Sequence, residues 1–243
     1  MTVTTAASDA VDARSVLRRW LPLWIGAGVY ALFVLAGNAL LIDPDTLWQV
    51  TVGQGIIDQR AVPHTDIYSF TMRGQPWIST QWLAQVMYAV CYNVAGWAGP
   101  VVLAATAIAA TFALFARALR RHLVDTTTLI FALGALALML PHLVARPHVL
   151  AMPVMVAWVG GLVAAMDRRD APSFALLPLM VLWANLHGGF VLGLALTAPF
   201  ALDAVVNAEP EKRTALLLRW ILFGVAALAA SCVTPYAWNA LLA

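Results

Sequence analysis

The amino-acid sequence predicts an all-α polytopic membrane protein, and three observations support this fold class. Hydrophobic residues make up 62% of the 243 positions and charged residues only 11%; the mean hydropathy of +0.82 is typical of membrane proteins and not of soluble domains. The apolar residues form runs of membrane-spanning length. Lys and Arg lie at the ends of these runs and form no single basic patch, so we expect a lipid bilayer and no nucleic acid as partner.

The N-terminal part of the chain predicts a short tail and a membrane anchor. Residues 1–17 are polar and rich in Ala and Thr, which indicates a disordered cytoplasmic N-terminus; residues 18–243 are expected to form a single transmembrane domain. The first apolar run, Leu21–Ile42, is long enough at about 1.5 Å per residue to cross a ~30 Å hydrocarbon core. It exceeds the ~7–15 apolar residues of a signal peptide, which favours a retained anchor.

The longest interruption between apolar segments follows this run. We expect residues 43–99 to form a large outer loop that contains two helices lying in the membrane interface. Asp43 is a good N-cap and Pro44 a good first residue for a helix over 45–58. A second helix over 81–95 has Gln and Tyr on one face and apolar residues on the other, and at roughly 22 Å it is short for a span. If residues 81–95 instead form a short membrane span, all later spans cross the membrane in the opposite direction.

The distribution of positive charge decides between these topologies. With the second loop helix flat in the interface, all Lys and Arg residues except Arg60, Arg73 and Arg146 lie on the cytoplasmic side, as the positive-inside rule requires. We therefore predict seven spans, with the N-terminus inside and the C-terminus outside. In chain order the predicted spans cover Leu21–Ile42, Pro100–Ala118, Thr126–Val144, Val149–Met166, Phe174–Leu186, Phe190–Val206 and Trp220–Thr234.

This topology gathers unusual polar residues at the outer face, where Asp43 and Asp45 are the first candidates for chemistry. A carboxylate in this place can act as general base toward an acceptor hydroxyl. The pair can also hold a divalent cation if further oxygen ligands complete the site. The structural alternative is that Asp43 caps the following helix and that the helix dipole favours Asp45 in its first turn.

Arg146, in the sequence LVARPHVL, is a lone cation between two apolar segments. Such residues usually face a partner or a wet cavity. The guanidinium can bind phosphate oxygens in a bidentate manner. In the alternative interpretation it bonds to backbone carbonyls or to a loop carboxylate, and the sequence leaves both open.

Other polar residues are expected to line the same face and to contact a substrate. These candidates are His64, Asp66, His148, Asn185 and His187. A structural role is the alternative for the loop residues and for the histidine at a helix end. The three histidines come from separate turns without the paired spacing of zinc ligands, so no metal site is predicted.

The segment from Asp43 to Leu83 contains, in order, an acidic motif after the first span, a surface helix, a turn with Pro and Asp, a G-x-P-W motif and a Trp-Leu-led amphipathic helix. This order resembles the first outer loop of the GT-C membrane glycosyltransferases, which include the protein O-mannosyltransferases and the lipid A aminoarabinose transferases. In detail it is similar to uncharacterised bacterial members of that superfamily. The segments Arg146–His148 and Trp183–Gly189 resemble other outer-end segments of the same proteins.

The resemblance implies a bacterial inner-membrane enzyme that moves a sugar from a polyprenyl-phosphate donor to an acceptor hydroxyl on the periplasmic face. By position, Asp45 matches the acidic base of the family best, with Asp43 second. Several relatives carry a Lys or His where this chain has Gln75, which leaves Arg146 or Arg73 to bind the donor phosphate. The resemblance implies no cofactor, and a divalent cation at the Asp43 and Asp45 pair stays open.

The family shares a core of about seven transmembrane helices with a large first outer loop, and its members usually continue with further spans. The resemblance therefore implies that a chain ending at Ala243 is a truncated form. A non-catalytic assembly or lipid-binding subunit is the main alternative function. A transporter is a weaker alternative, because the centres of the predicted spans carry almost no ionisable residues.

Overall fold

The computed structural model describes residues 18–242, so the disorder expected for residues 1–17 lies outside the described part. Within that part, all regular elements are helices apart from one isolated antiparallel bridge between Thr65 and Pro76. The α-helices are α2 (Leu21–Leu35), α3 (Asp45–Gln59), α4 (Trp82–Ala95), α5 (Ala98–Leu119), α6 (Asp125–Met139), α7 (Pro147–Asp167), α8 (Leu177–Leu186), α9 (Phe190–Val206) and α10 (Arg213–Ser231). The 3-10 helices are η1 (Gly37–Leu41), η2 (Leu140–His142), η3 (Phe174–Leu176), η4 (Pro210–Lys212) and η5 (Ala237–Leu241).

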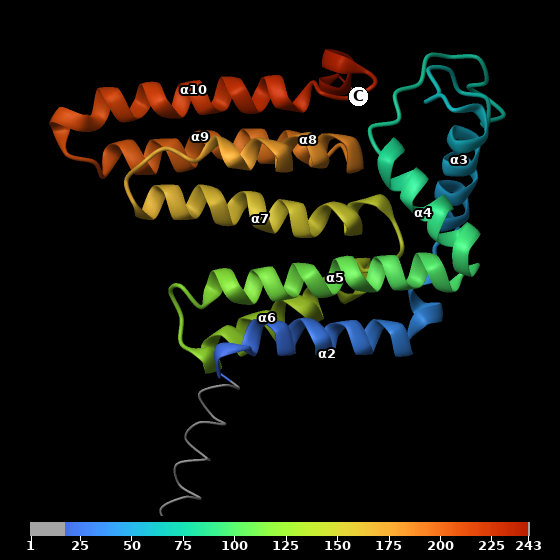
Figure 1. Ribbon diagram of the computed structural model, residues 1–243, viewed down its shortest axis with the longest axis horizontal. Helices are drawn as coiled ribbons and strands as arrows, with labels where there is room; N and C mark the ends of the chain where they lie inside the picture. The colour runs from blue at the N-terminus through green and yellow to red at the C-terminus, as the bar shows by residue number, and fades with distance from the viewer. Residues whose placement is uncertain (1–17, 243) are drawn as a thin grey trace, which may run out of the picture.

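Two groups of helices are set at a steep angle to each other (Figure 1). Helices α2 and α5 to α10 lie alongside one another with their axes along the length of the molecule, and we call this group the long bundle. Helices α3 and α4 pack on each other across one end of the long bundle. We call this the loop end, because it also carries the segment between α3 and α4.

The lengths and apolar surfaces of the helices confirm a membrane protein. Four helical segments are long and apolar enough to cross a membrane: Ala98–Leu119, Asp125–His142, Pro147–Asp167 and Pro210–Ser231. Three shorter apolar helical segments accompany them: Leu21–Leu35, Phe174–Leu186 and Phe190–Val206. Large apolar side chains on α6 and α10 point outward, which soluble proteins avoid over such areas and lipid-facing helices require. The seven-span arrangement and its orientation stay predictions.

Three of the predicted spans differ in their bounds. The first run was expected to extend to Ile42; α2 ends at Leu35, and the chain continues as the 3-10 helix η1 from Gly37 to Leu41. The α-helix α6 ends at Met139, just before Pro141, whose ring cannot continue it. Helix α10 begins at Arg213, well before the predicted start at Trp220, because Arg is a good helix former.

The two helices of the loop end pack closely through a glycine. Gly53 on α3 is buried directly against the main chain of Gln85 on α4, where a Cβ atom would clash with the Gln85 carbonyl and lie 2.9 Å from the Cβ of Ala89. A larger residue at this position would push the two helix backbones apart. This contact fixes α3, and with it the acidic residues at its start, relative to α4.

The face of α4 that packs inward is the polar one. Gln85 and Tyr88, expected on the polar face of the second loop helix, are completely buried, whereas Val94 on the apolar face is 83% exposed. In a membrane protein the apolar face of such a helix is free to meet lipid, so its polar face turns toward the protein. Tyr88 thereby comes within reach of the segment that precedes α7.

Candidate functional site

Two carboxylates and a guanidinium meet at the loop end of the molecule. Arg146 is the residue immediately before α7, and its guanidinium contacts both Asp43 and Asp45 at the start of α3. The Arg146 Nη1 atom lies 3.4 Å from Asp43 Oδ2, and Nη2 contacts Asp45 Oδ2. We call Asp43, Asp45 and Arg146 the acid–arginine cluster. With two negative groups and one positive group, it carries a net negative charge.

Three hydrogen bonds to the main chain of residues 145 and 146 hold Arg146 in place. The preceding residue, Ala145, donates its N–H to the carbonyl of Leu40 in η1 (2.8 Å) and accepts a bond from the buried Thr46 hydroxyl (3.1 Å). The carbonyl of Arg146 accepts a bond from the Tyr88 hydroxyl at 3.1 Å. Segments that lie far apart in the sequence are thus tied together at the cluster.

The sequence pattern did not identify Thr46 and Tyr88 as part of the site. Both side chains are buried, at 2% and 0% exposure, and each hydroxyl reaches a main-chain carbonyl of the Arg146 segment. For Tyr88, the usable signal was the row of polar residues on α4, because a polar helix face in an apolar protein needs hydrogen-bond partners inside the protein.

Asp43 contacts both the start of α3 and Arg146. Its Oδ1 atom accepts the N–H of Asp45, the first residue of α3, at 2.9 Å, while the N-cap position that the sequence predicted for Asp43 is taken by Pro44. Its Oδ2 atom faces Arg146. The partners of Arg146 are the carboxylates of Asp43 and Asp45, as in one of the two interpretations that the sequence left open. The side chains of Arg146 and Asp45 are 39% and 43% exposed, so the cluster is open to solvent and to ligands.

Two histidines lie side by side near the cluster. The rings of His148 and His187 have centroids 6.3 Å apart. Nε2 of His148 bonds to the carbonyl of His142 at 3.0 Å, and Nδ1 of His187 accepts the N–H of Gly189 at 2.9 Å. Because a carbonyl only accepts, His148 carries its proton on Nε2, and neutral His187 carries its proton on Nε2 as well. One open acceptor, His148 Nδ1, and one donor, His187 Nε2, remain for other partners.

The His187 ring makes the stability of the protein dependent on pH. Burial, followed by the charge of His148, lowers the pKa of His187 below its usual value. A lowered pKa in the folded state means that the contribution to stability is fully present above the unfolded pKa of about 6.5 and is lost as pH falls through the folded pKa. Protonation of Nδ1 also removes the acceptor for the Gly189 N–H.

We therefore expect His187→Asn to reduce the loss of stability below about pH 6.5, because the Asn oxygen can accept the same N–H and does not titrate. Thermal unfolding of the detergent-solubilised wild type and variant between pH 5 and 8 measures this. The other four histidines are present in both proteins, so the difference between the two curves reports on His187 together with its interaction with His148. Identical slopes would contradict the expectation.

Asn185 forms hydrogen bonds that join three segments of the chain. Its side-chain oxygen accepts the Trp82 indole N–H at 2.8 Å, and its amide nitrogen donates to the carbonyls of Val181 (2.7 Å) and Val233 (2.8 Å). These bonds join α4, α8 and the segment after α10. Asn185 also lies on the wall of a cavity of about 500 Å³ between α4 and α8, whose other lining residues are mostly apolar.

The remaining predicted residues lie in the segment between α3 and α4, and they are not gathered at the cluster. The His64 ring packs edge-on against Tyr236 with centroids 5.1 Å apart, next to a bond from the Tyr236 hydroxyl to Pro63 O. Asp66 accepts bonds from the Ser69 hydroxyl and from the N–H groups of Tyr68 and Ser69. These hold the pKa of Asp66 below its usual range, with the Ser69 hydroxyl contributing most. Arg73 is exposed.

A divalent cation does not fit the cluster as it stands. Among residues 18–242, no group of three or more His, Cys, Asp or Glu side chains is arranged to hold a metal ion. Asp43 and Asp45 alone supply too few oxygen ligands, and their oxygens face Arg146.

The cluster can take up an anion through an exchange of partners at Arg146. A phosphate oxygen can replace a carboxylate at the Arg146 guanidinium, since both accept bidentate bonds from it. The exchange would release a carboxylate next to the bound phosphate. Comparisons of the chain with protein-family models, with curated proteins and with solved structures give no match.

Proposed function

We propose that this chain is a membrane glycosyltransferase of the GT-C type that uses a polyprenyl-phosphate sugar donor. The observation that supports the proposal best is the convergence of Asp43, Asp45 and Arg146 at one end of a bundle of apolar helices. A carboxylate base and a phosphate-binding guanidinium are the two groups that sugar transfer from a lipid phosphate needs.

In the proposed reaction the acceptor hydroxyl displaces the lipid phosphate from the anomeric carbon in a single step. Arg146 binds the donor phosphate and neutralises the charge that develops on it as the sugar–phosphate bond breaks. This binding draws Arg146 away from Asp45. The freed Asp45 carboxylate then takes the proton of the acceptor hydroxyl as the new glycosidic bond forms.

The surroundings of the cluster are compatible with an amphipathic donor. The cavity beside Asn185 has apolar walls, and the outward face of α4 carries exposed valines. In this proposal the lipid tail lies against these surfaces and the loop end faces the periplasmic side of a bacterial inner membrane. The acceptor is a hydroxyl compound that reaches the cluster from the aqueous side.

The ion pairing within the cluster favours one alternative. Arg146 has carboxylate partners in this structure. These ion pairs are sufficient for a purely structural role, in which they hold α3 against α7. A non-catalytic assembly or lipid-binding subunit would keep the cluster for this purpose. The alternative differs from the proposal in that it needs no donor phosphate at Arg146.

Native mass spectrometry of the detergent-purified protein tests the proposal. We expect a co-purifying polyprenyl phosphate, or its glycosylated form, in the wild type and its loss in Arg146→Ala, because the phosphate loses its bidentate partner. Arg121→Ala, which removes an exposed arginine from the turn after α5, is the matched control and should retain the lipid. Only bulk phospholipid in all three proteins would argue for the non-catalytic alternative.

A further inference from the structure

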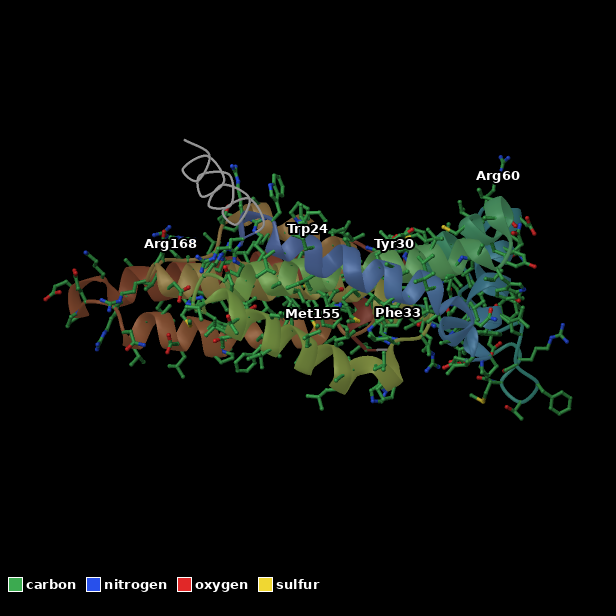
Figure 2. All side chains as sticks on the ribbon, turned by 90° about the horizontal axis from the view of Figure 1, so that it is seen from below. Trp24, Tyr30, Phe33, Arg60, Met155 and Arg168 are labelled. Atoms are coloured by element: carbon green, nitrogen blue, oxygen red, sulfur yellow. The ribbon has the colours of Figure 1, made fainter. Side chains whose placement is uncertain are left out.

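A basic cavity lies at the end of the long bundle opposite the acid–arginine cluster. It is formed by the turn that follows α7 and the turn between α9 and α10, and it encloses about 350 Å³. Figure 2 shows Arg168, in the first of these turns, far from Arg60, which ends α3. The charged lining consists of Arg168, Arg169, Lys212 and Arg219 against Asp170 and Glu209. Four positive groups against two negative groups leave the cavity with a net positive charge.

The two acidic groups of this cavity are already paired. Asp170 Oδ1 lies 2.7 Å from Arg219 Nη1, and Glu209 Oε2 lies 2.7 Å from Lys212 Nζ. Arg168 and Arg169 have no carboxylate within ion-pair distance among residues 18–242. The excess positive charge of the cavity therefore belongs to two adjacent guanidinium groups, and an anion is the ligand that would neutralise them.

The backbone of both turns is fixed. Arg169 adopts a left-handed conformation with φ 52°, and the N–H of Asp170 bonds to Ala165 O at 3.0 Å, which closes the end of α7. In the other turn, Arg213 donates to the carbonyls of Val206 (2.8 Å) and Ala208 (3.1 Å) at the end of α9. Arg213 is thus engaged in closing a helix, whereas Arg168 and Arg169 extend from a closed turn toward the cavity that they line.

The cavity is bordered by apolar surface, which selects the kind of anion. Its floor includes the buried residues Ala208 and Leu216. Next to Arg219, helix α10 exposes an apolar stripe at helical spacing, and its residues are Leu218, Ile221, Leu222 and Val225, each more than half exposed. In a membrane protein such a stripe meets acyl chains. A phosphate group attached to acyl chains would satisfy both surfaces at once, which a free phosphate would not.

We propose that this cavity binds the phosphate headgroup of an anionic phospholipid, with Arg168 and Arg169 on the phosphate and the acyl chains along the exposed stripe of α10. Basic cavities between membrane helices recognise such headgroups through this combination of charge and apolar contact. The site is separate from the acid–arginine cluster and does not depend on the proposed sugar transfer. Its effect is to anchor the ends of α7, α9 and α10 to one leaflet.

Lipid titration followed by native mass spectrometry tests this site. The full chain in neutral detergent is titrated with phosphatidylglycerol, with phosphatidylcholine and with inorganic phosphate. We expect wild type to prefer phosphatidylglycerol and the double variant Arg168→Gln/Arg169→Gln to bind it about 25-fold more weakly, since each cation near a membrane surface contributes about fivefold. Thermal unfolding of the same samples verifies that the variant is folded.

The double variant Arg117→Gln/Arg121→Gln is the matched control, because it removes the same charge from the C-terminal end of α5 and the turn that follows it, at the same end of the long bundle as the cavity. Its affinity for phosphatidylglycerol should change less than threefold. An equal loss in both double variants would show a general charge effect and overturn the proposal. Equal binding of phosphatidylcholine, or competition by millimolar inorganic phosphate, would overturn it as well.

Discussion

The Gly53→Ala variant is expected to unfold at a lower temperature than the wild type and to lose the geometry of the acid–arginine cluster. Gly53 lies against the main chain of Gln85, so an added methyl group meets backbone, which cannot rotate away, and also comes within 2.9 Å of the Ala89 Cβ. Overpacking of a well-filled contact costs about 1–3 kcal/mol. Because α3 would move away from α4, Asp45 at its start would shift relative to Arg146.

Gly134→Ala on α6 is the control for this variant. A Cβ at Gly134 has no neighbour within 4 Å, so the substitution should stabilise the helix by roughly 0.5–1 kcal/mol through lower backbone entropy in the unfolded chain. Thermal unfolding in detergent compares the two, and lipid retention in native mass spectra reports on the cluster. A Gly53→Ala protein as stable as Gly134→Ala would mean that α3 and α4 are not held together by this contact.

The Asp45→Asn variant is expected to reduce sugar transfer by about 10²–10⁴-fold, the usual contribution of a general base. Asn has nearly the same shape, and its amide oxygen can still accept a bond from Arg146. It cannot take the proton of an acceptor hydroxyl. Folding and donor binding should therefore persist while turnover falls, a combination that a purely structural residue would not produce.

The measurement is transfer from the donor found with the purified wild-type protein, followed in reconstituted vesicles with matched protein amounts. Asp58→Asn is the control, since Asp58 is exposed near the other end of α3 and its carboxylate, within residues 18–242, accepts a bond from the Gln54 side chain alone. It should transfer sugar at the wild-type rate. Unchanged transfer in Asp45→Asn would remove the catalytic role and leave the cluster as a structural joint.

Fold class and the two loop helices were accessible from the sequence because they depend on local patterns. Apolar runs indicated a membrane protein, and the Asp-Pro pair indicated the start of α3, although Pro44 and not Asp43 takes the N-cap position. The change from α-helix to 3-10 helix after Leu35 could not be predicted in this way, because hydropathy does not register it. Hydropathy also cannot tell whether a polar helix face meets water or protein, and so the burial of Gln85 was not foreseen.

The sequence named Asp43, Asp45 and Arg146 individually, but it left their pairing with one another open. The positive-inside rule placed Arg146 on the same face as Asp43 and Asp45, yet whether it faces them or a phosphate depends on the register of α7 against α3. That register is set by Thr46 and Tyr88, which bond to the main chain on either side of the Arg146 N–H. Arg73 was grouped with the site on sequence grounds, but the exposed turn that carries it is not bonded to the cluster.

The wide sequence separation between Asp45 and Arg146 has a consequence during synthesis. About 100 residues separate the two partners, and ribosomes add about 5–20 residues per second. The two carboxylates are therefore synthesised about 5–20 s before the guanidinium that pairs with them. In that interval Asp43 and Asp45 lack their Arg146 partner, and the cluster can form only after α5, α6 and the start of α7 have been synthesised.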